Sequence, residues 1–302
     1  MEQFEKYKDF RAGYITIIGR PNCGKSTLMN SLLKFKLSIV TNKPQTTRQN
    51  VLGILTGENY QIVFWDTPGL LTPKYKLQEA MLKAARYAIQ DADLIFFMSE
   101  ADGKFKEKDL EFIQTLELDA SRTFLLINKI DLVAKDSLLP LIDYFASSNT
   151  CKEIFPISAL KNEGLTELLK TSISLLPLSP PFYPETEIST HPERFFVAEI
   201  IREKIFLNYE QEIPYSTTVH IEEFIERPAQ KDYIRAAIFV ERDTQRRILI
   251  GKKGQALKKI GQQARLEIEA FIGRPVYLQL WVGVKEKWRG DQRFLKELGY
   301  LK

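Results

Sequence analysis

The chain carries Gly19-Arg20-Pro21-Asn22-Cys23-Gly24-Lys25-Ser26-Thr27 near its N-terminus. These residues fit Gly-x-x-x-x-Gly-Lys-Ser, the pattern of a phosphate-binding P-loop. Residues 13–18, just before it, are β-branched and aromatic, which is typical of a buried strand, and residues 28–33 after it favour a helix. Strand, glycine loop and helix is the context that the motif requires, so an exposed Gly-Lys turn is the weaker interpretation. The sequence therefore predicts a phosphate site in an α/β fold.

The chemistry of this loop follows from its residue types. Gly19 and Gly24 let the backbone turn so that successive N–H groups face phosphate oxygens, and the helix N-terminus adds partial positive charge. We expect Lys25 to reach the β- and γ-phosphates and the Ser26 hydroxyl to bind Mg²⁺. Cys23 is expected to be a small side chain that points away from phosphate. All nine residues of the loop are candidate nucleotide contacts.

Length and composition place the chain among globular proteins. Its 302 residues predict two domains, on a prior of roughly 150 residues each. No apolar run approaches the roughly 18 residues needed to span a bilayer, and the charged N-terminus lacks the apolar core of a signal peptide. Two cysteines, Cys23 and Cys151, are too few for a disulfide framework or a zinc site. We therefore expect a cytoplasmic protein.

Charge is distributed unevenly along the chain. Residues 1–185 have 22 basic and 22 acidic side chains, and residues 186–240 have 6 against 10. Residues 241–302 have 15 against 7, a net charge of +8. This basic C-terminal end indicates an anionic partner, either nucleic acid or a membrane surface.

Two polar segments after the P-loop helix are candidates for mobile loops. The first, residues 42–50, has no periodicity and contains Thr46 and Thr47, whose hydroxyls we expect to close on Mg²⁺ and the γ-phosphate. A strand at 60–65 then ends in Asp66-Thr67-Pro68-Gly69, where Asp66 can bind Mg²⁺ through water and the Gly69 N–H can meet the γ-phosphate. Residues 70–78 form the second predicted mobile loop.

The base is selected by Asn128-Lys129-Ile130-Asp131, which follows a predicted strand at 123–127. The Asp131 carboxylate can accept hydrogen bonds from guanine N1–H and the 2-amino group. Adenine offers neither donor there and would leave a buried carboxylate unpaired. We expect Asn128 to brace the site, the Lys129 stem to lie along the base, and a backbone N–H near Ala159 of Ser158-Ala159-Leu160 to face guanine O6.

The motifs fall at the ends of predicted strands that alternate with predicted helices. This alternation predicts a mostly parallel sheet with helices on both faces, which binds ligands at the carboxyl ends of its strands. Further strands are expected at 93–98 and 153–157, and helices at 79–91, 108–118 and 164–176.

A proline-rich segment at 176–184 reads as a stiff linker because its four prolines cannot continue a helix. We predict an N-terminal α/β domain over 1–182. The remainder, 183–302, is expected to hold the linker and an α+β domain with a core at about 205–284 and a C-terminal helix at 288–302. Within it the pattern predicts helices at 192–207 and 255–271, and strands at 216–225, 233–240 and 276–282.

The second domain contains Gly251-Lys252-Lys253-Gly254, which we place between a strand at 246–250 and a basic helix. A Gly-x-x-Gly loop at a helix N-terminus lets backbone N–H groups approach phosphates closely, and the lysines add charge. Lys258 follows on the helix. Ile248, Ile250, Ala256 and Ile260 are expected to floor a groove for splayed bases. A lone Gly-x-x-Gly is most often an ordinary turn, but its place in the +8 segment favours RNA binding.

These motifs together resemble the Era family of bacterial GTPases, which carry a C-terminal type II KH domain. The similarity rests on Gly19–Thr27, on Asp66–Gly69 and Asn128–Asp131, and in the second half on segments including 213–216, 248–254 and 284–289, and it covers about 13–300. The resemblance implies binding of the single-stranded 3′ end of 16S rRNA by the KH domain, with 251–254 as the clamping loop. It also implies a role in maturation of the small ribosomal subunit and peripheral association with the cytoplasmic face of the cell membrane. We expect a monomer.

The expected reaction is Mg²⁺-dependent hydrolysis of GTP to GDP, driven by positioning and charge neutralisation. Lys25, Thr47 and Gly69 are the candidate catalytic residues, and Ser26, Thr47 and Asp66 the candidate metal ligands. Leu70 follows the Asp66–Gly69 motif, and because an apolar side chain cannot polarise water, unstimulated turnover should be slow. Relatives with an apolar residue here sometimes use K⁺ held by a P-loop asparagine, the position of Asn22.

Two other functions stay open from sequence. One is an RNA-binding assembly module whose nucleotide site is only structural, against which the intact Lys25, Ser26, Asp66 and Asp131 argue. The other is a GTPase whose basic end binds anionic lipid, although lipid attraction needs charge and not the backbone turn of a Gly-x-x-Gly loop.

Overall fold

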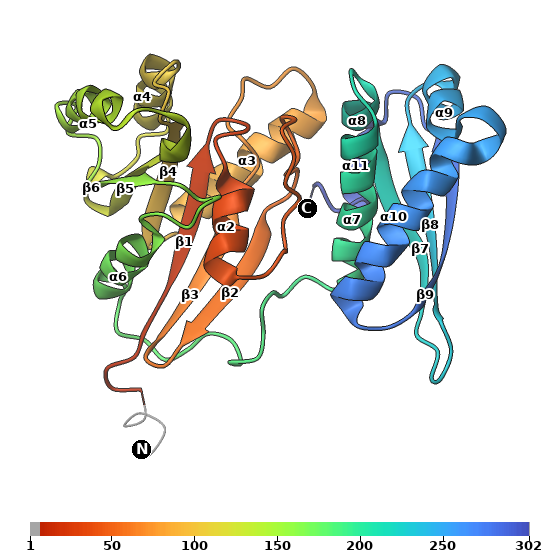
Figure 1. Cartoon of the computed structure of the whole chain (residues 1–302), viewed down its shortest axis with the longest axis horizontal. Coiled ribbons are helices and arrows are strands. Elements are labelled where there is room, and N and C mark those ends of the chain that lie inside the picture. The colour runs from red at the N-terminus through yellow and green to blue at the C-terminus, as the bar shows by residue number, and fades with distance from the viewer. Residues whose placement is uncertain (1–6, 302) are drawn as a thin grey trace. The chain divides into compact units, whose positions relative to one another are not determined.

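The computed structural model describes residues 7–301, so the first six residues of the predicted N-terminal domain and Lys302 lie outside the described residues. The chain divides into two compact units (Figure 1). The first comprises residues 7–38, Thr47–Pro73 and Met81–Thr190, and the second comprises Ile39–Thr46, Lys74–Ala80 and the chain from His191 onward. Two short segments of the N-terminal half therefore pack with the C-terminal half.

A six-stranded sheet forms the centre of the first unit. Its strands are β1 (Arg11–Gly19), β2 (Val51–Gly57), β3 (Tyr60–Asp66), β4 (Leu94–Glu100), β5 (Thr123–Asn128) and β6 (Glu153–Ile157). Their spatial order is β2-β3-β1-β4-β5-β6, with β2 antiparallel to β3 and every other pair parallel. The parallel strands end at one edge of the sheet, which is where β1, β3 and β5 deliver the three predicted nucleotide motifs.

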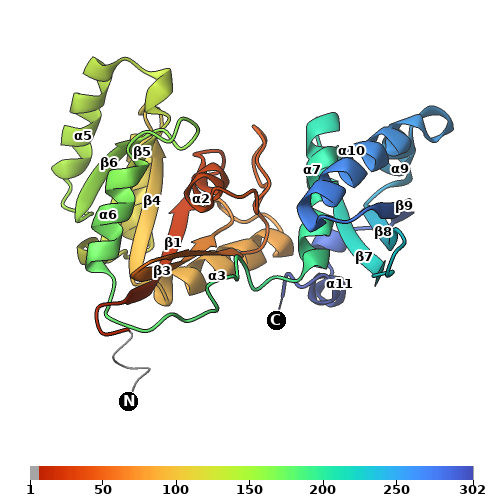
Figure 2. The same cartoon turned by 60° about the horizontal axis from the view of Figure 1, so that its bottom comes forward.

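Helices cover both faces of this sheet (Figures 1 and 2). They are α2 (Lys25–Leu33), α3 (Lys76–Gln90), α4 (Lys106–Thr115), α5 (Leu138–Ala146) and α6 (Leu165–Leu175). One buried cluster joins α3, α4 and α5 to the sheet through Ile89, Ile113 and Phe145 on the helices and Phe97 and Leu125 on the strands. The sheet is thus buried on both faces, as the near-continuous apolar runs of β1, β4 and β5 require.

The proline-rich segment is hydrogen-bonded along the first unit. The side-chain oxygen of Gln61 accepts the backbone N–H groups of Phe182 at 2.7 Å and Tyr183 at 2.9 Å, and the Ile54 N–H donates to the Ile188 carbonyl at 2.7 Å. The first unit consequently continues to Thr190.

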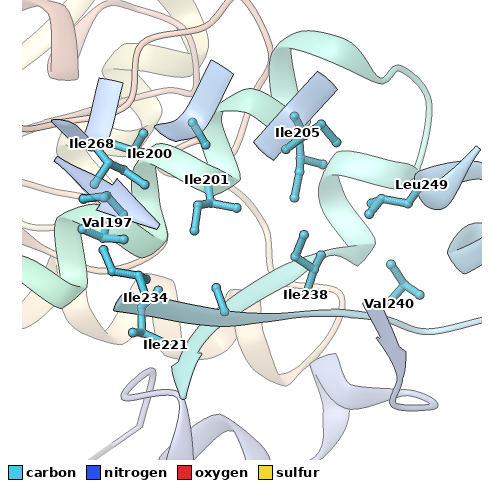
Figure 3. Close-up of a cluster of buried hydrophobic side chains, with 14 of the residues drawn as sticks. Val197, Ile200, Ile201, Ile205, Ile221, Ile234, Ile238, Val240, Leu249 and Ile268 are labelled. Carbon is cyan, nitrogen blue, oxygen red and sulfur yellow. The ribbon is translucent and has the colours of Figure 1, made fainter. Parts of the chain in front are cut away.

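The second unit is an α+β layer structure. Its main elements are α7 (Glu193–Asn208), α8 (Ile213–Ser216), β7 (Thr218–Ile225), β8 (Asp232–Val240), α9 (Asp243–Ile250), α10 (Gln255–Ile272), β9 (Val276–Val284) and α11 (Gln292–Glu297). The sheet order is β7-β8-β9, with β7 antiparallel and β9 parallel to β8. Ile201 and Ile205 of α7 meet Ile234 and Ile238 of β8 in the core (Figure 3).

Five elements differ from the sequence-based expectation. The strand predicted at 246–250 is the second half of helix α9, and the helix predicted at 288–302 is a 3₁₀ turn at Trp288–Gly290 followed by α11 over Gln292–Glu297 alone. Strand β2 and helices α5 and α8 have no counterpart in that expectation. The α9 error has a local cause, because the Gln245 side-chain oxygen accepts the Arg242 N–H at 3.0 Å and starts a helix that buries Leu249 completely.

Candidate nucleotide site and nucleic-acid interface

The P-loop joins β1 to α2, and Lys25 is the first residue of that helix. Lys25 is 6% exposed, and its ammonium donates to the Gly19 carbonyl at 3.1 Å and the Arg20 carbonyl at 3.0 Å. Carbonyl oxygens of the loop thus hold a nearly buried positive charge at the N-terminus of a helix. A phosphate oxygen bound here would replace these neutral carbonyls as the acceptor for Lys25. Because the phosphate is charged, the hydrogen bonds of the Lys25 ammonium would be stronger.

Three oxygen-bearing side chains meet beside Lys25. The Ser26 hydroxyl donates to Asp66 Oδ2 at 2.7 Å and lies 3.0 Å from Thr47 Oγ1, and Thr47 donates to the same carboxylate oxygen at 3.4 Å. Asp66 Oδ1 is buried and has no hydrogen-bond partner within residues 7–301. Burial raises the pKa of the Asp66 carboxyl, while Lys25 and the hydroxyls oppose the rise.

This arrangement fits Mg²⁺. Two hydroxyls and a carboxylate with a buried, unpaired oxygen are hard oxygen donors, and Mg²⁺ prefers one or two such protein ligands together with phosphates and waters. When bound, the ion would neutralise charge that develops on the phosphates. The structure places the three predicted metal ligands, Ser26, Thr47 and Asp66, within hydrogen-bonding distance of one another.

The predicted base-recognition residues form one network. The Asn128 amide donates to the Cys23 carbonyl at 2.7 Å, and its oxygen accepts the Ala159 N–H at 2.9 Å. The Ser158 hydroxyl donates to Asp131 Oδ1 at 2.6 Å, which orients that carboxylate. Asn128 therefore links the phosphate loop to the base loop, while Leu160 beside them is 69% exposed.

The segment from Asp66 to Gly69 lies against the P-loop. The Leu70 N–H donates to the Gly19 carbonyl at 2.9 Å, and a Cβ built on Gly69 would come within 2.8 Å of the Pro21 backbone. Thr67 donates its hydroxyl to the Ile17 carbonyl at 2.8 Å, and Pro68 is buried. Leu70 is 2% exposed, so its side chain belongs to the core.

Three residues next to the site, Ser99, Glu100 and Asp109, were not predicted from the sequence. Lys129 makes an ion pair with Glu100 at 2.6 Å, and the preceding Ser99 donates to Asp109, which in turn pairs with Arg20. Ser99 and Glu100 end β4, and their position at the carboxyl end of a central strand is a signal that could have found them.

In the second unit, a groove of about 480 Å³ runs between α10 and β9 and begins at the glycine loop. Its lining residues are Gly254, Leu257, Lys258, Gly261, Gln262, Arg265, Leu278 and Leu280. Gly251 has φ +71°, and a Cβ there would come within 2.6 Å of Ala256 Cβ, so the turn into α10 excludes larger residues. An apolar floor with cationic side chains at its rim suits unstacked bases with their phosphates outside.

The structure brings some of the predicted RNA contacts to this groove and not others. Gly254 and Lys258 line it, and Lys252 and Lys253 form the turn at its end. Ile248 and Ile250 lie on α9 outside the lining, and the predicted floor residue Ile260 is fully buried in the core. The lining residues that were not predicted are Leu257, Gly261, Gln262 and Arg265, at helical spacing from Gly254, and Leu278 and Leu280 on β9. The available signal was Gly261, since an isolated glycine inside a helix often has a packing or functional reason.

The fold and the two sites define a P-loop GTPase with a C-terminal KH domain. Residues 14–129 match the family described as 50S ribosome-binding GTPase, and residues 212–289 match the KH domain family. The chain is 42% identical over 291 residues to GTPase Era of Ruminiclostridium cellulolyticum, covering 96% of this chain and 98% of that protein. It belongs to the Era family and is a GTPase.

Two solved structures support this membership. A crystal structure of Era in complex with MgGDPNP and nucleotides 1506–1542 of 16S ribosomal RNA has a TM-score of 0.93 and 41% identity. A single-residue variant of Aquifex aeolicus Era bound to GDP·AlF4⁻ has a TM-score of 0.92 and 40% identity. Each comparison covers 97% of this chain and 100% of the other.

Proposed function

We propose that this GTPase is a Mg²⁺-dependent molecular switch that binds the 3′ end of 16S rRNA and assists assembly and maturation of the 30S ribosomal subunit. The observation that carries the proposal is the pairing, in one chain, of a complete guanine-nucleotide site with a Gly-Lys-Lys-Gly groove of the size and chemistry of a single-stranded RNA site. The Era relative that was solved with this RNA segment covers nearly the whole chain.

The geometry of the first unit supports the following roles in hydrolysis. Lys25 and the loop amides would bind the phosphates, Ser26 and Thr47 would hold Mg²⁺ with Asp66 orienting it, and the Gly69 N–H would meet the γ-phosphate. Asp131 reads the guanine base while Ser158 fixes its carboxylate. The residue that follows Gly69 is Leu70, whose apolar side chain is in the core and cannot orient water, so intrinsic turnover should be slow.

We infer that the nucleotide state is coupled to the KH domain through residues 42–50 and 70–78. Support comes from contacts inside the second unit, where Lys43 donates to the carbonyls of Phe206 and Tyr209 at the end of α7, and buried Arg202 donates to the Thr46 carbonyl. Thr47, the next residue, packs with the first unit. Ligation of Mg²⁺ by Thr47 would therefore shift the adjoining Thr46 peptide, whose carbonyl is hydrogen-bonded to Arg202 of α7.

K⁺ is a further proposed cofactor. Asn22 has a left-handed backbone with φ 68° in the P-loop, at the position where related GTPases with an apolar residue after the Asp-x-x-Gly motif hold the ion. The prediction is faster GTP hydrolysis in K⁺ than in Na⁺ at equal ionic strength. Equal rates in the two salts would remove K⁺ from the mechanism.

The partner is tested by direct binding. We expect an oligonucleotide of the 16S rRNA 3′ end to bind the monomeric protein in a salt-dependent manner and more tightly than a scrambled sequence, and Lys253→Asp to weaken that binding. Anionic vesicles form the second arm, since the basic terminal segment also attracts lipid. Isolated 30S and 50S subunits form the third.

Two outcomes would contradict the proposal. One is equal binding of both RNA sequences, and the other is binding to vesicles or 50S subunits alone. In residues 7–301 no helix has the length and apolarity to cross a bilayer. The vesicle experiment therefore measures attachment of these residues to the membrane surface.

A further inference from the structure

A nearly buried ion pair lies behind the P-loop. Arg20 Nε is 2.5 Å from Asp109 Oδ1, and Arg20 Nη2 is 3.5 Å from Oδ2. The side chains are 11% and 1% exposed, respectively. Asp109 lies on α4, so the pair connects the phosphate loop to a helix that contributes no residue to the predicted nucleotide site.

Both partners are held by further contacts. The Ser99 hydroxyl at the end of β4 donates to Asp109 Oδ2 at 2.5 Å, and the Arg20 guanidinium lies 3.9 Å from the centre of the Phe105 ring. The carboxylate thus has hydrogen bonds on both oxygens, and the guanidinium is fixed between a charge and an aromatic face. These contacts direct the Arg20 side chain toward Asp109 and Phe105, while its carbonyl accepts a hydrogen bond from the Lys25 ammonium.

The backbone that follows Arg20 needs such support. Asn22 has φ 68°, a left-handed backbone conformation that asparagine tolerates better than most residues but that still limits how the loop can be built. Pro21 is in turn packed against Gly69 at the limit of contact. Strained backbone of this kind persists where the surrounding structure fixes it on several sides.

A role in geometry explains the pair better than a role in stability. Exposed ion pairs contribute little to stability, and a buried pair often gives no net stability over apolar residues of the same volume. Asp109 is 1% exposed and its partner is the second residue of the phosphate loop, so the pair's effect is expected on the position of that loop.

We propose that Arg20 and Asp109 are a positioning pair for the GTPase reaction, which holds Arg20–Cys23 in the shape that receives the phosphates and the Lys25 ammonium. The pair acts through the loop backbone and does not touch the nucleotide. Phe105 supports it by stacking on the guanidinium.

The test compares Asp109→Asn, Arg20→Gln, Arg20→Lys and Phe105→Leu with the control Asp119→Asn, which alters an exposed aspartate on the same unit. Three quantities are measured on the full chain: the dissociation rate of a fluorescent GDP, the single-turnover rate at saturating GTP and Mg²⁺, and the free energy of unfolding in urea. We expect GDP to dissociate roughly tenfold faster and single turnover to slow roughly tenfold in Asp109→Asn and Arg20→Gln. Arg20→Lys, which keeps the charge, should recover part of both rates.

Further results discriminate positioning from stability alone. Phe105→Leu should shift both rates in the same direction by a smaller factor, and Arg20→Gln/Asp109→Asn should be no worse than the worse single variant, since the two residues act as a unit. Asp119→Asn should have wild-type rates. Wild-type dissociation and turnover in folded Phe105→Leu and Arg20→Lys would overturn the proposal, whether or not Asp109→Asn folds. A lower unfolding free energy with unchanged rates in Asp109→Asn would overturn it equally.

Discussion

The nucleotide site and the KH groove are built in opposite ways. In the first, buried polar side chains are already hydrogen-bonded, Ser26 to the Asp66 carboxylate and Asn128 to the backbone of Cys23, and removal of one group leaves another unpaired in a dry environment. In the second, the lining is open and its cations face solvent, so each contact contributes separately. Single substitutions should therefore cause large losses in the first site and graded ones in the second.

Asp131→Asn gives the largest expected effect. The amide no longer accepts both guanine donors, so affinity for GDP should fall by about 10³-fold or more while xanthosine diphosphate, which presents an oxygen in place of the 2-amino group, gains affinity. Titration of both fluorescent diphosphates measures this. A GDP affinity near that of the wild type would mean that Asp131 does not read the base.

Gly69→Ala tests the close approach of the Asp66–Gly69 segment to the P-loop. Because the added methyl would meet the Pro21 backbone at 2.8 Å, the segment must shift, and kcat should fall roughly 10²-fold with GDP affinity little changed. Gly290→Ala is the matched control, since a Cβ there meets nothing within 4 Å. An unaltered kcat would show that hydrolysis does not depend on the close approach of this segment to the P-loop.

Lys253→Asp should have an intermediate effect confined to RNA. Loss of one cation and gain of an anion at the Gly-Lys-Lys-Gly turn should weaken binding of the rRNA 3′ oligonucleotide roughly tenfold and reduce the slope of log K against log salt by about 1. Basal GTP hydrolysis without RNA should keep its wild-type rate. A salt titration of RNA binding measures the slope, and a hydrolysis assay without RNA measures the basal rate. An unchanged slope would mean that the RNA does not contact Lys253.

Gly261→Ala should produce the smallest effects, which are a gain in stability and a loss of RNA affinity. Alanine inside α10 should stabilise the protein by about 0.5–1 kcal/mol, and its methyl would have ordinary contact with Leu280 at 3.5 Å. The same methyl fills part of the groove and should weaken RNA binding a fewfold. Urea unfolding and RNA titration on one preparation measure both. Gain of stability with undiminished RNA affinity would mean that bases do not reach Gly261.

The same difference explains which parts the sequence could predict. Motifs such as Gly19–Thr27 and Asn128–Asp131 join ligand-binding residues within a few positions, so local chemistry identified them and placed them at strand ends. The groove combines α10 with β9, which only tertiary packing brings together. The strand predicted at 246–250 is a helix. A short apolar run fits either structure, and only the tertiary packing that buries Leu249 decides between them. Asp109 was missed because its partner Arg20 is 89 residues away.

Single-turnover GTP hydrolysis with and without the 3′-terminal 16S rRNA oligonucleotide tests the central claim most directly. If the two sites form one switch, the oligonucleotide should change the hydrolysis rate of the wild-type protein, a scrambled oligonucleotide should not, and Lys253→Asp should require more RNA for the same change. An identical rate at saturating RNA, with nucleotide affinity also unchanged, would show two independent sites on one chain and contradict the account.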